Sequence, residues 1–381
     1  MKNTKCNWII IAVFALLILA LGIAPWATPD KTFSENENRT LQTMPQFTAN
    51  ALLGGTLDDS VESYLADQFW QRDSWTALRS GVKMALQNKD IGGVYLCDDG
   101  YYVEVFTQND LDEARYTKNL GYLRAFFEQC KVQVAPEDIT FLLVPTPGYV
   151  LQDKLPRYAT LFDQDTVFEE IGAAFTDINF LDLRESFREE QKTTQLYYRT
   201  DHHWTTAGAF YAYGQWRLSL GETAPDAGDY SVQSYEGFRG TLYSKVLDSR
   251  AAIDTIELYR IPGDDALTVE YNGATHTSCY DLEKLQQKNM YEVFLGGNFP
   301  TVTIRGGAEN GRNLLVIKDS YANSFLPFAA SDYESITIID LRYFLGSMKT
   351  VLAENNITDV LVLYSASAFL SDQNMSRLIL G

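Results

Sequence analysis

Histidine is the scarcest chemically active residue of this chain. Three histidines occur among 381 residues, and two of them stand side by side at His202 and His203. Positive charge is also in short supply, with 31 lysines and arginines against 50 acidic residues and a formal net charge of −19. Because a phosphate backbone repels such a chain, this balance excludes a nucleic-acid partner and gives no support for docking on anionic lipid.

Cysteine is nearly as rare, with four residues in the chain. Cys6 precedes an apolar N-terminal run and leaves Cys97, Cys130 and Cys279, an odd number that cannot all pair internally. Their spacing matches no zinc motif, and we expect buried free thiols in preference to one disulfide. Apolar residues make up 46% of the composition, so the chain can bury a large core.

The N-terminus carries the pattern of an exported protein. Lys2 and Lys5 precede an apolar run over residues 8–25, as a basic region precedes a hydrophobic one in targeting segments. No small-x-small cleavage site closes the run, so we expect a retained membrane anchor over residues 1–28, with cleavage and secretion as the alternative. Residues 29–90 predict a polar tether and a helical neck, and residues 91–381 predict one large extracytoplasmic domain.

The pattern within that domain is typical of the α/β class. We expect a strand pair at 91–105, a helix at 111–130, and buried strands at 140–145, 178–183, 314–317, 335–340 and 359–364, with helices between them. Apolar strands without alternation, separated by helices, predict a mainly parallel sheet covered on both faces. Residues 226–310 break this rhythm and predict a β-rich insertion, with a hairpin at Tyr271-Asn-Gly-Ala.

Two polar segments far apart in the chain predict one chemical site. Asp201-His202-His203-Trp204 supplies a histidine, which shuttles protons near neutral pH, and an acid that can hold its tautomer. Ser320 follows a buried strand and precedes a helix, where free N–H groups can hold an oxyanion. Since ligands gather beyond the carboxyl ends of strands in open α/β sheets, we predict Ser320 as nucleophile, His203 as general base and Asp201 as its orienting carboxylate.

Plainer interpretations stay open at these positions. Asp319 and Ser320 can simply cap the following helix, and His202 can exchange roles with His203. Asp201 and the two histidines can ligate a metal, but no His-x-x-x-His motif or cysteine pair completes a zinc site, so we predict neither metal nor cofactor. The motif can also be a rigid polar turn.

Five further residues are candidates for substrate contacts. Arg342 and Tyr343 follow one predicted strand and Tyr364 ends another, so they can face the same crevice and position an acyl or sugar group. Trp204 and Tyr321 offer aromatic faces on which a sugar ring can stack. Each of these roles depends on the side chain reaching the surface of the crevice.

The chain resembles the DHHW family of exported proteins, named for the motif at residues 201–204. Further blocks match in the same order: Phe33-Ser-Glu-Asn-Glu-Asn-Arg39, Asp67-Gln-Phe-Trp-Gln-Arg-Asp73, Lys318-Asp-Ser-Tyr-Ala-Asn-Ser324 and Asp340-Leu-Arg-Tyr343. That family is similar to the SGNH-hydrolase-like alginate O-acetyltransferases, which carry Asp-x-His-Trp and a later nucleophilic serine. The resemblance implies an SGNH-hydrolase-like three-layer fold and the same roles for Asp201, His203 and Ser320. Lys318 departs from the pattern, because it stands where Gly-Asp-Ser has its glycine.

These observations predict an extracytoplasmic, serine-dependent O-acetyltransferase or acetylesterase that acts on a cell-surface polysaccharide. The resemblance also implies a membrane-bound acyltransferase partner that supplies acetyl groups. The alternative hypothesis is a non-catalytic glycan-binding or assembly protein on the same fold. Replacement of Ser320 by Ala separates the two, because only the enzyme needs the hydroxyl.

Overall fold

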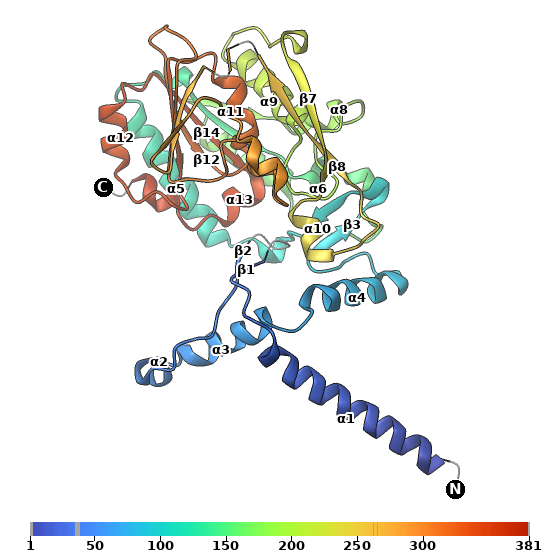
Figure 1. Cartoon of the computed structure of the whole chain (residues 1–381). Coiled ribbons are helices and arrows are strands. Elements are labelled where there is room, and N and C mark those ends of the chain that lie inside the picture. Colours follow the sequence, from blue (N-terminus) through green and yellow to red (C-terminus); the bar gives the residue numbers. More distant parts are fainter. Residues whose placement is uncertain (1–2, 35–38, 262, 265, 380–381) are drawn as a thin grey trace. The chain divides into compact units, whose positions relative to one another are not determined.

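The computed structural model describes residues 3–34, 39–261, 263–264 and 266–379 (Figure 1). The chain divides into two compact units, Met1–Asn88 with Ser244–Ser249, and Lys89–Tyr243 with Arg250–Gly381. The smaller unit contains α1 (Asn3–Ala27), the short strands β1 (Phe33–Ser34) and β2 (Arg39–Thr40), and the helices α2 (Ala49–Leu53), α3 (Thr56–Asp67) and α4 (Arg72–Ala85). Residues 35–38 of the first resembling block lie outside the described part.

The smaller unit is mainly helical. Across the residues that the structure describes, no helix is long and apolar enough to cross a membrane. The region predicted as a neck contains two helices, α3 and α4, separated at Gln71, which has a left-handed backbone with φ of 56°. Next to this break, Gln68 fastens the tether, because its side chain accepts a hydrogen bond from the Lys31 N–H and donates to the Lys31 and Gln42 carbonyls, each at 2.9 Å.

The larger unit is built on an eight-stranded sheet with the order β10-β9-β11-β13-β12-β14-β5-β6. The five strands from β13 to β6 are parallel, and β11, β9 and β10 add antiparallel neighbours. The predicted α/β class with a mainly parallel sheet is therefore confirmed. The eight strands of the sheet are β5 (Ile139–Val144), β6 (Asn179–Asp182), β9 (Thr268–Tyr271), β10 (Ala274–His276), β11 (Thr301–Arg305), β12 (Asn313–Lys318), β13 (Ser335–Asp340) and β14 (Asp359–Ser365).

Helices cover both faces of this sheet, as continuous apolar strands require. Val316 and Leu361 pack in one core with α9 (Thr206–Ser219) and α11 (Ala322–Ala329). Their strand neighbours Leu315 and Val362 pack in the other core, with α5 (Glu113–Cys130), α7 (Gln164–Ala174), α12 (Met348–Glu354) and α13 (Ala366–Ser371). Alternate residues of one strand thus enter opposite cores, and the larger unit has three layers.

The insertion at 226–310 is β-rich, as predicted, but it does not form a body of its own. Strands β7 (Ser231–Phe238) and β8 (Asp254–Arg260) pair as an antiparallel ribbon, followed along the chain by β9, β10 and β11, which extend the main sheet beyond β13. The predicted hairpin joins β9 to β10 through Asn272 and Gly273, whose φ angles of 50° and 73° match a type I′ turn. A second predicted hairpin pairs β3 (Val94–Leu96) with β4 (Tyr102–Glu104).

The three cysteines outside the N-terminal run are buried free thiols, as the odd count predicts. Burial raises the pKa of Cys97, Cys130 and Cys279 to about 12 in each case. A thiol that stays protonated at neutral pH is a poor nucleophile, so these cysteines act as small apolar side chains of the core.

Candidate functional site

The two polar segments meet at the carboxyl edge of the parallel strands. Ser320 lies in the turn between the end of β12 and the start of α11, and the Asp201–Trp204 segment precedes α9. Thr205 caps α9 by accepting a hydrogen bond from the Gly208 N–H at 3.0 Å. Since α9 and α11 pack in the same core, the two segments that begin these helices lie side by side.

Three side chains form a continuous hydrogen-bonded chain at this meeting point. The Ser320 Oγ lies 2.7 Å from Nε2 of His203, and Nδ1 of the same ring lies 2.5 Å from Oδ1 of Asp201. Asp201 and His203 are buried, whereas Ser320 is partly exposed. The serine hydroxyl is therefore accessible while the groups behind it are shielded from water.

This geometry decides between the alternatives that the sequence left open. Asp319 takes the capping role, since Oδ1 accepts from the Tyr321 N–H at 2.9 Å and Oδ2 accepts from the Ser365 N–H at 2.8 Å. The hydroxyl of Ser320 is left for His203. His202 does not replace its neighbour, because its Nδ1 lies 2.7 Å from the Thr241 hydroxyl.

A metal site fits these side chains less well than a hydrogen-bonded site. Asp201, His202 and His203 place ligand atoms within 4.8 Å of one another. Both ring nitrogens of His203, however, are already engaged with Asp201 and Ser320. A metal ion on this ring would have to displace one of those two bonds.

The Asp201 carboxylate is held ionised by its partners. Oδ1 accepts from the backbone N–H of His203 at 2.9 Å, and Oδ2 accepts from the N–H and hydroxyl of Thr241 at 2.7 and 3.1 Å. Burial by itself raises the pKa of this carboxyl, but the charges of His203 and His202 and these hydrogen bonds outweigh burial and hold the pKa well below its usual range. Asp201 thus remains a hydrogen-bond acceptor for Nδ1 of His203.

His203 is held neutral by its surroundings. Burial, followed by the charge of His202, lowers the pKa of His203 to about 4, although Asp201 acts in the opposite direction. A neutral imidazole that donates from Nδ1 to Asp201 presents a free lone pair at Nε2. Near pH 7 this nitrogen can accept the proton of the Ser320 hydroxyl.

Tyr291 is a central residue of the site that sequence reasoning missed. Its ring stacks on the imidazole of His203, with centroids 3.9 Å apart and planes inclined by 12°. Its hydroxyl donates to the Ser320 carbonyl at 3.1 Å and bonds the Ser324 hydroxyl at 3.0 Å. Tyr291 therefore holds both the His203 ring and the serine turn, from a position in the insertion that carries no distinctive local motif.

Lys318 is the second unexpected feature. Its fully buried ammonium donates to Oδ1 of Asn298 and Oδ1 of Asn323, each at 2.7 Å, and lies 3.5 Å from Asp340. Burial lowers the pKa of Lys318 to about 8, against the pull of Asp340. The lysine that stands in place of a glycine thus braces the strand end that carries Ser320.

The five predicted substrate residues divide into two groups. The side chain of Arg342 is 39% exposed and forms a two-bond pair with Asp340, at 2.9 and 2.6 Å, and Tyr343 is 49% exposed. Trp204, Tyr321 and Tyr364 are at most 3% exposed. The structure therefore leaves only Arg342 and Tyr343 accessible to a ligand.

The buried aromatic residues join the site instead of lining it. The indole N–H of Trp204 donates to the Tyr321 carbonyl at 3.0 Å and to the Ser324 hydroxyl at 2.9 Å. The hydroxyl of Tyr321 donates in return to the His202 carbonyl. These bonds lock the DHHW segment to the serine turn, and Tyr364 packs in the core beneath the sheet.

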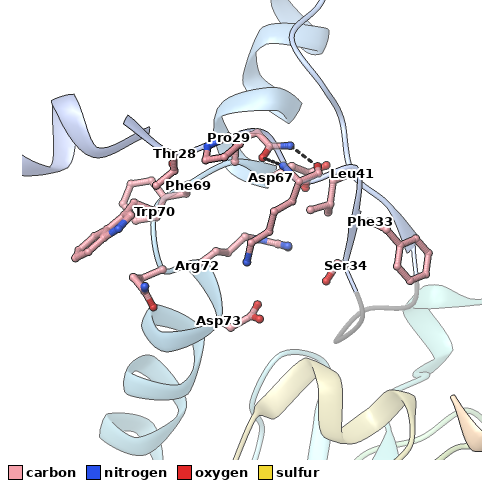
Figure 2. A pocket seen from close by; sticks show the side chains of 13 residues that line it. Thr28, Pro29, Phe33, Ser34, Leu41, Asp67, Phe69, Trp70, Arg72 and Asp73 are labelled. Atoms are coloured by element: carbon pink, nitrogen blue, oxygen red, sulfur yellow. Dashed lines mark hydrogen bonds between the residues drawn. The ribbon is translucent and has the colours of Figure 1, made fainter. Parts of the chain in front are cut away.

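The smaller unit has a pocket of its own, and none of the candidate site residues lines it (Figure 2). It has a volume of about 480 Å³ and is lined by Phe33, Phe69 and Trp70 together with polar side chains such as Asp67 and Arg72. Figure 2 shows that these side chains come from the tether and from the break between α3 and α4. The pocket therefore brings together two of the blocks on which the resemblance rests.

The family model described as DHHW protein matches residues 157–339, which contain Asp201, His203 and Ser320. The likeness to the DHHW family model thus covers this region of the chain. This match confirms the predicted resemblance. No curated protein sequence matches the chain.

Solved structures agree with this DHHW assignment. A DHHW family protein from Eubacterium siraeum is 25% identical with a TM-score of 0.62, and the match covers 76% of this chain and 97% of that one. Bacillus cereus PatB1 is 22% identical with a TM-score of 0.60, covering 72% and 96%. PatB1 with a sulfonyl adduct is 21% identical with a TM-score of 0.60, covering 75% and 97%. The SGNH-hydrolase-like fold predicted for the chain is confirmed.

Proposed function

We propose that this DHHW protein is a serine-dependent O-acetyltransferase or acetylesterase acting on a cell-surface polysaccharide. The observation that carries the proposal is the hydrogen-bonded chain from Ser320 through His203 to Asp201. A partly exposed serine bonded to a buried neutral imidazole, which is itself oriented by a carboxylate, is the arrangement that activates a hydroxyl for attack on an ester.

In the first half of the reaction, Ser320 Oγ attacks the carbonyl carbon of an acetyl ester while His203 Nε2 takes the hydroxyl proton. Collapse of the tetrahedral intermediate breaks the ester bond, and the imidazolium returns that proton to the leaving alkoxide. In the second half, a polysaccharide hydroxyl or water attacks acetyl-Ser320, and the same nitrogen moves its proton back to Ser320. Asp201 stabilises the imidazolium in both halves.

Two donors are available for the oxyanion that forms in each half. In the part of the chain that the structure describes, the backbone N–H of Ser320 donates to no other group. Asn298 precedes β11, whose first residue pairs with Ile339 near the carboxyl end of β13, so this side chain lies at the same edge. Oδ1 of Asn298 accepts hydrogen bonds from Lys318 and Asn323. The amide N–H groups of Asn298 therefore point away from these two residues and are the second donor that we assign to the oxyanion.

The same carboxyl edge of the sheet also carries side chains that could contact a substrate. Arg342 and Tyr343 are exposed beside the end of β13 and would contact the polysaccharide. The N-terminal sequence supports an extracytoplasmic location, where acetyl groups need a donor, and a membrane-bound acyltransferase would supply them. A glycan-binding protein without catalysis remains the competing function, because the same exposed side chains would serve it.

An acetyl-enzyme assay tests the proposal. We expect the full chain mixed with nitrophenyl acetate to release nitrophenol and to gain the mass of one acetyl group on Ser320. Ser320→Ala and His203→Ala should do neither, whereas Ser371→Ala, at an exposed serine of α13, should behave as wild type. No acetylation of the wild-type chain, in the presence of its expected membrane partner as well, would favour the binding function.

Gly240 gives an independent test of the Asp201 geometry. A Cβ atom at this position would lie 2.1 Å from Oδ2 of Asp201, so Gly240→Ala must displace the carboxylate. We expect nitrophenyl acetate hydrolysis to fall by at least about tenfold, because His203 loses its orienting partner. Gly121→Ala, at an exposed glycine of α5 whose Cβ meets nothing within 4 Å, is the matched control and should keep full activity. Equal rates for the two variants would contradict the role of Asp201.

A further inference from the structure

A small cavity of the larger unit lies next to the residues that flank Ser320 and His203 in the chain. Its walls include Tyr321 and His202, the chain neighbours of those two residues. The rings of His202 and Tyr321 have centroids 3.9 and 5.3 Å from that of His203. The side chains of His202 and Tyr321 therefore line the cavity and also lie next to the ring of His203, the proposed general base.

The sheet order places this cavity on one side of the serine. Besides Tyr321, which follows β12, it is lined by Thr146 and Pro147, which follow β5, and by Ser367, which follows β14. Strands β12, β14 and β5 are neighbours, so these residues share one carboxyl edge. Arg342 follows β13, on the opposite side of β12. An acyl group and a polysaccharide can therefore approach Ser320 from different sides.

The walls of the cavity are mainly apolar and close together. Phe106, Leu161 and Phe162 line it, with Glu104 as the one acidic lining residue. Phe106 and Phe162 pack edge to face with centroids 5.1 Å apart. Gly148 also lines the cavity, and a Cβ atom at this position would lie 2.5 Å from a Leu161 methyl group, so this wall is tightly packed.

The volume of the cavity is about 30 Å³, enough for one or two water-sized groups. A methyl group fits into such a space and an unbranched chain of three or more carbons does not. We infer that this cavity is the acyl pocket of the enzyme, which receives the methyl group of the acyl ester on Ser320 and restricts the reaction to acetyl groups. The inference rests on the proposed function and assigns Phe106 and Leu161 as residues that determine acyl-chain length.

The test compares kcat/KM for nitrophenyl acetate, butyrate and hexanoate with the full chain. Wild type should favour acetate over butyrate by at least about tenfold, because even one methylene group is worth that much in a hydrophobic pocket. Phe106→Ala and Leu161→Ala each remove part of a wall and should raise the butyrate-to-acetate ratio by about tenfold or more. Both side chains are partly exposed, so neither truncation empties the main core.

Two matched variants complete the test. Ser367→Leu fills the cavity and should lower kcat/KM for acetate, whereas Tyr158→Ala, an 83% exposed residue near Leu161, should leave the ratio unchanged. An active wild type with no preference for acetate, or active wall variants with the wild-type ratio, would overturn the acyl pocket alone. Absence of acetyl-Ser320 in the wild type would overturn the proposed function and the acyl pocket together.

Discussion

Asp201→Asn is expected to lower kcat for nitrophenyl acetate by about a thousandfold to ten-thousandfold at pH 7. Oδ1 of Asp201 accepts from Nδ1 of His203 at 2.5 Å, which sets the tautomer with a lone pair on Nε2. An asparagine that turns its amide N–H toward Nδ1 favours the opposite tautomer, whose Nε2 carries the proton and cannot accept another from Ser320. The loss should appear in kcat more than in KM, because Asp201 lies behind the ring and is not exposed to substrate.

The control for this prediction is a change of the same type elsewhere. Asp229→Asn, at an exposed position in the turn before β7, should keep wild-type kinetics. Circular dichroism of both variants shows whether the fold survives the loss of the hydrogen bond from the backbone N–H of His203 to Oδ1 of Asp201. A folded Asp201→Asn variant with kcat within tenfold of wild type would show that His203 does not depend on this carboxylate.

The second large effect is a loss of stability in acid that originates at His203. Its pKa is about 4 in the folded protein, because burial disfavours the imidazolium, and about 6.5 in an unfolded chain. Between these two pH values the unfolded state binds a proton that the folded state does not, so the free energy of unfolding falls as the pH falls. The difference of about 2.5 pKa units corresponds to about 3 kcal/mol, fully present above pH 6.5 and lost by pH 4.

Urea unfolding of wild type and His203→Gln at several pH values isolates this contribution. The variant cannot titrate at position 203, so the difference in unfolding free energy between the two proteins should shrink or reverse by about 3 kcal/mol from pH 7 to pH 4. A difference that stays constant over this interval would place the pKa of His203 near its ordinary value. In the same range, hydrolysis by wild type should persist to about pH 5, because the imidazole is still neutral there.

Much of the fold is visible in local sequence signals. The apolar runs of β5, β12, β13 and β14 can be recognised as buried strands without knowing which strands they pair with. The turn at Asn272-Gly273 is likewise predictable, because both residue types favour the positive φ angles that the turn requires. The same signals do not show on which face of the sheet a given side chain lies. Every position of β14 is apolar or buried, so alternation gives no warning that Tyr364 faces the core.

The residues of the candidate site were predictable from the sequence where they lie at the end of a strand or at the start of a helix. Ser320 and His203 each stand just before a helix, and parallel strands bring such positions to one edge. Tyr291 and Asn298 carry no comparable mark. They reach the site only because β11 folds back beside β13, and such a long-range pairing leaves no trace in the residues next to them.

The sequence by itself determined the α/β class, the two polar segments that form the candidate site, and the strongly acidic charge balance. Only the tertiary structure decided that Ser320 bonds His203 while Asp319 caps the turn, that Trp204 and Tyr321 are buried braces, and that a small, mainly apolar cavity forms next to His202 and Tyr321. The physical reason is one of scale. Periodicity and composition report burial averaged over a segment, whereas a hydrogen bond of 2.5 to 2.7 Å depends on packing between segments that are distant in the chain.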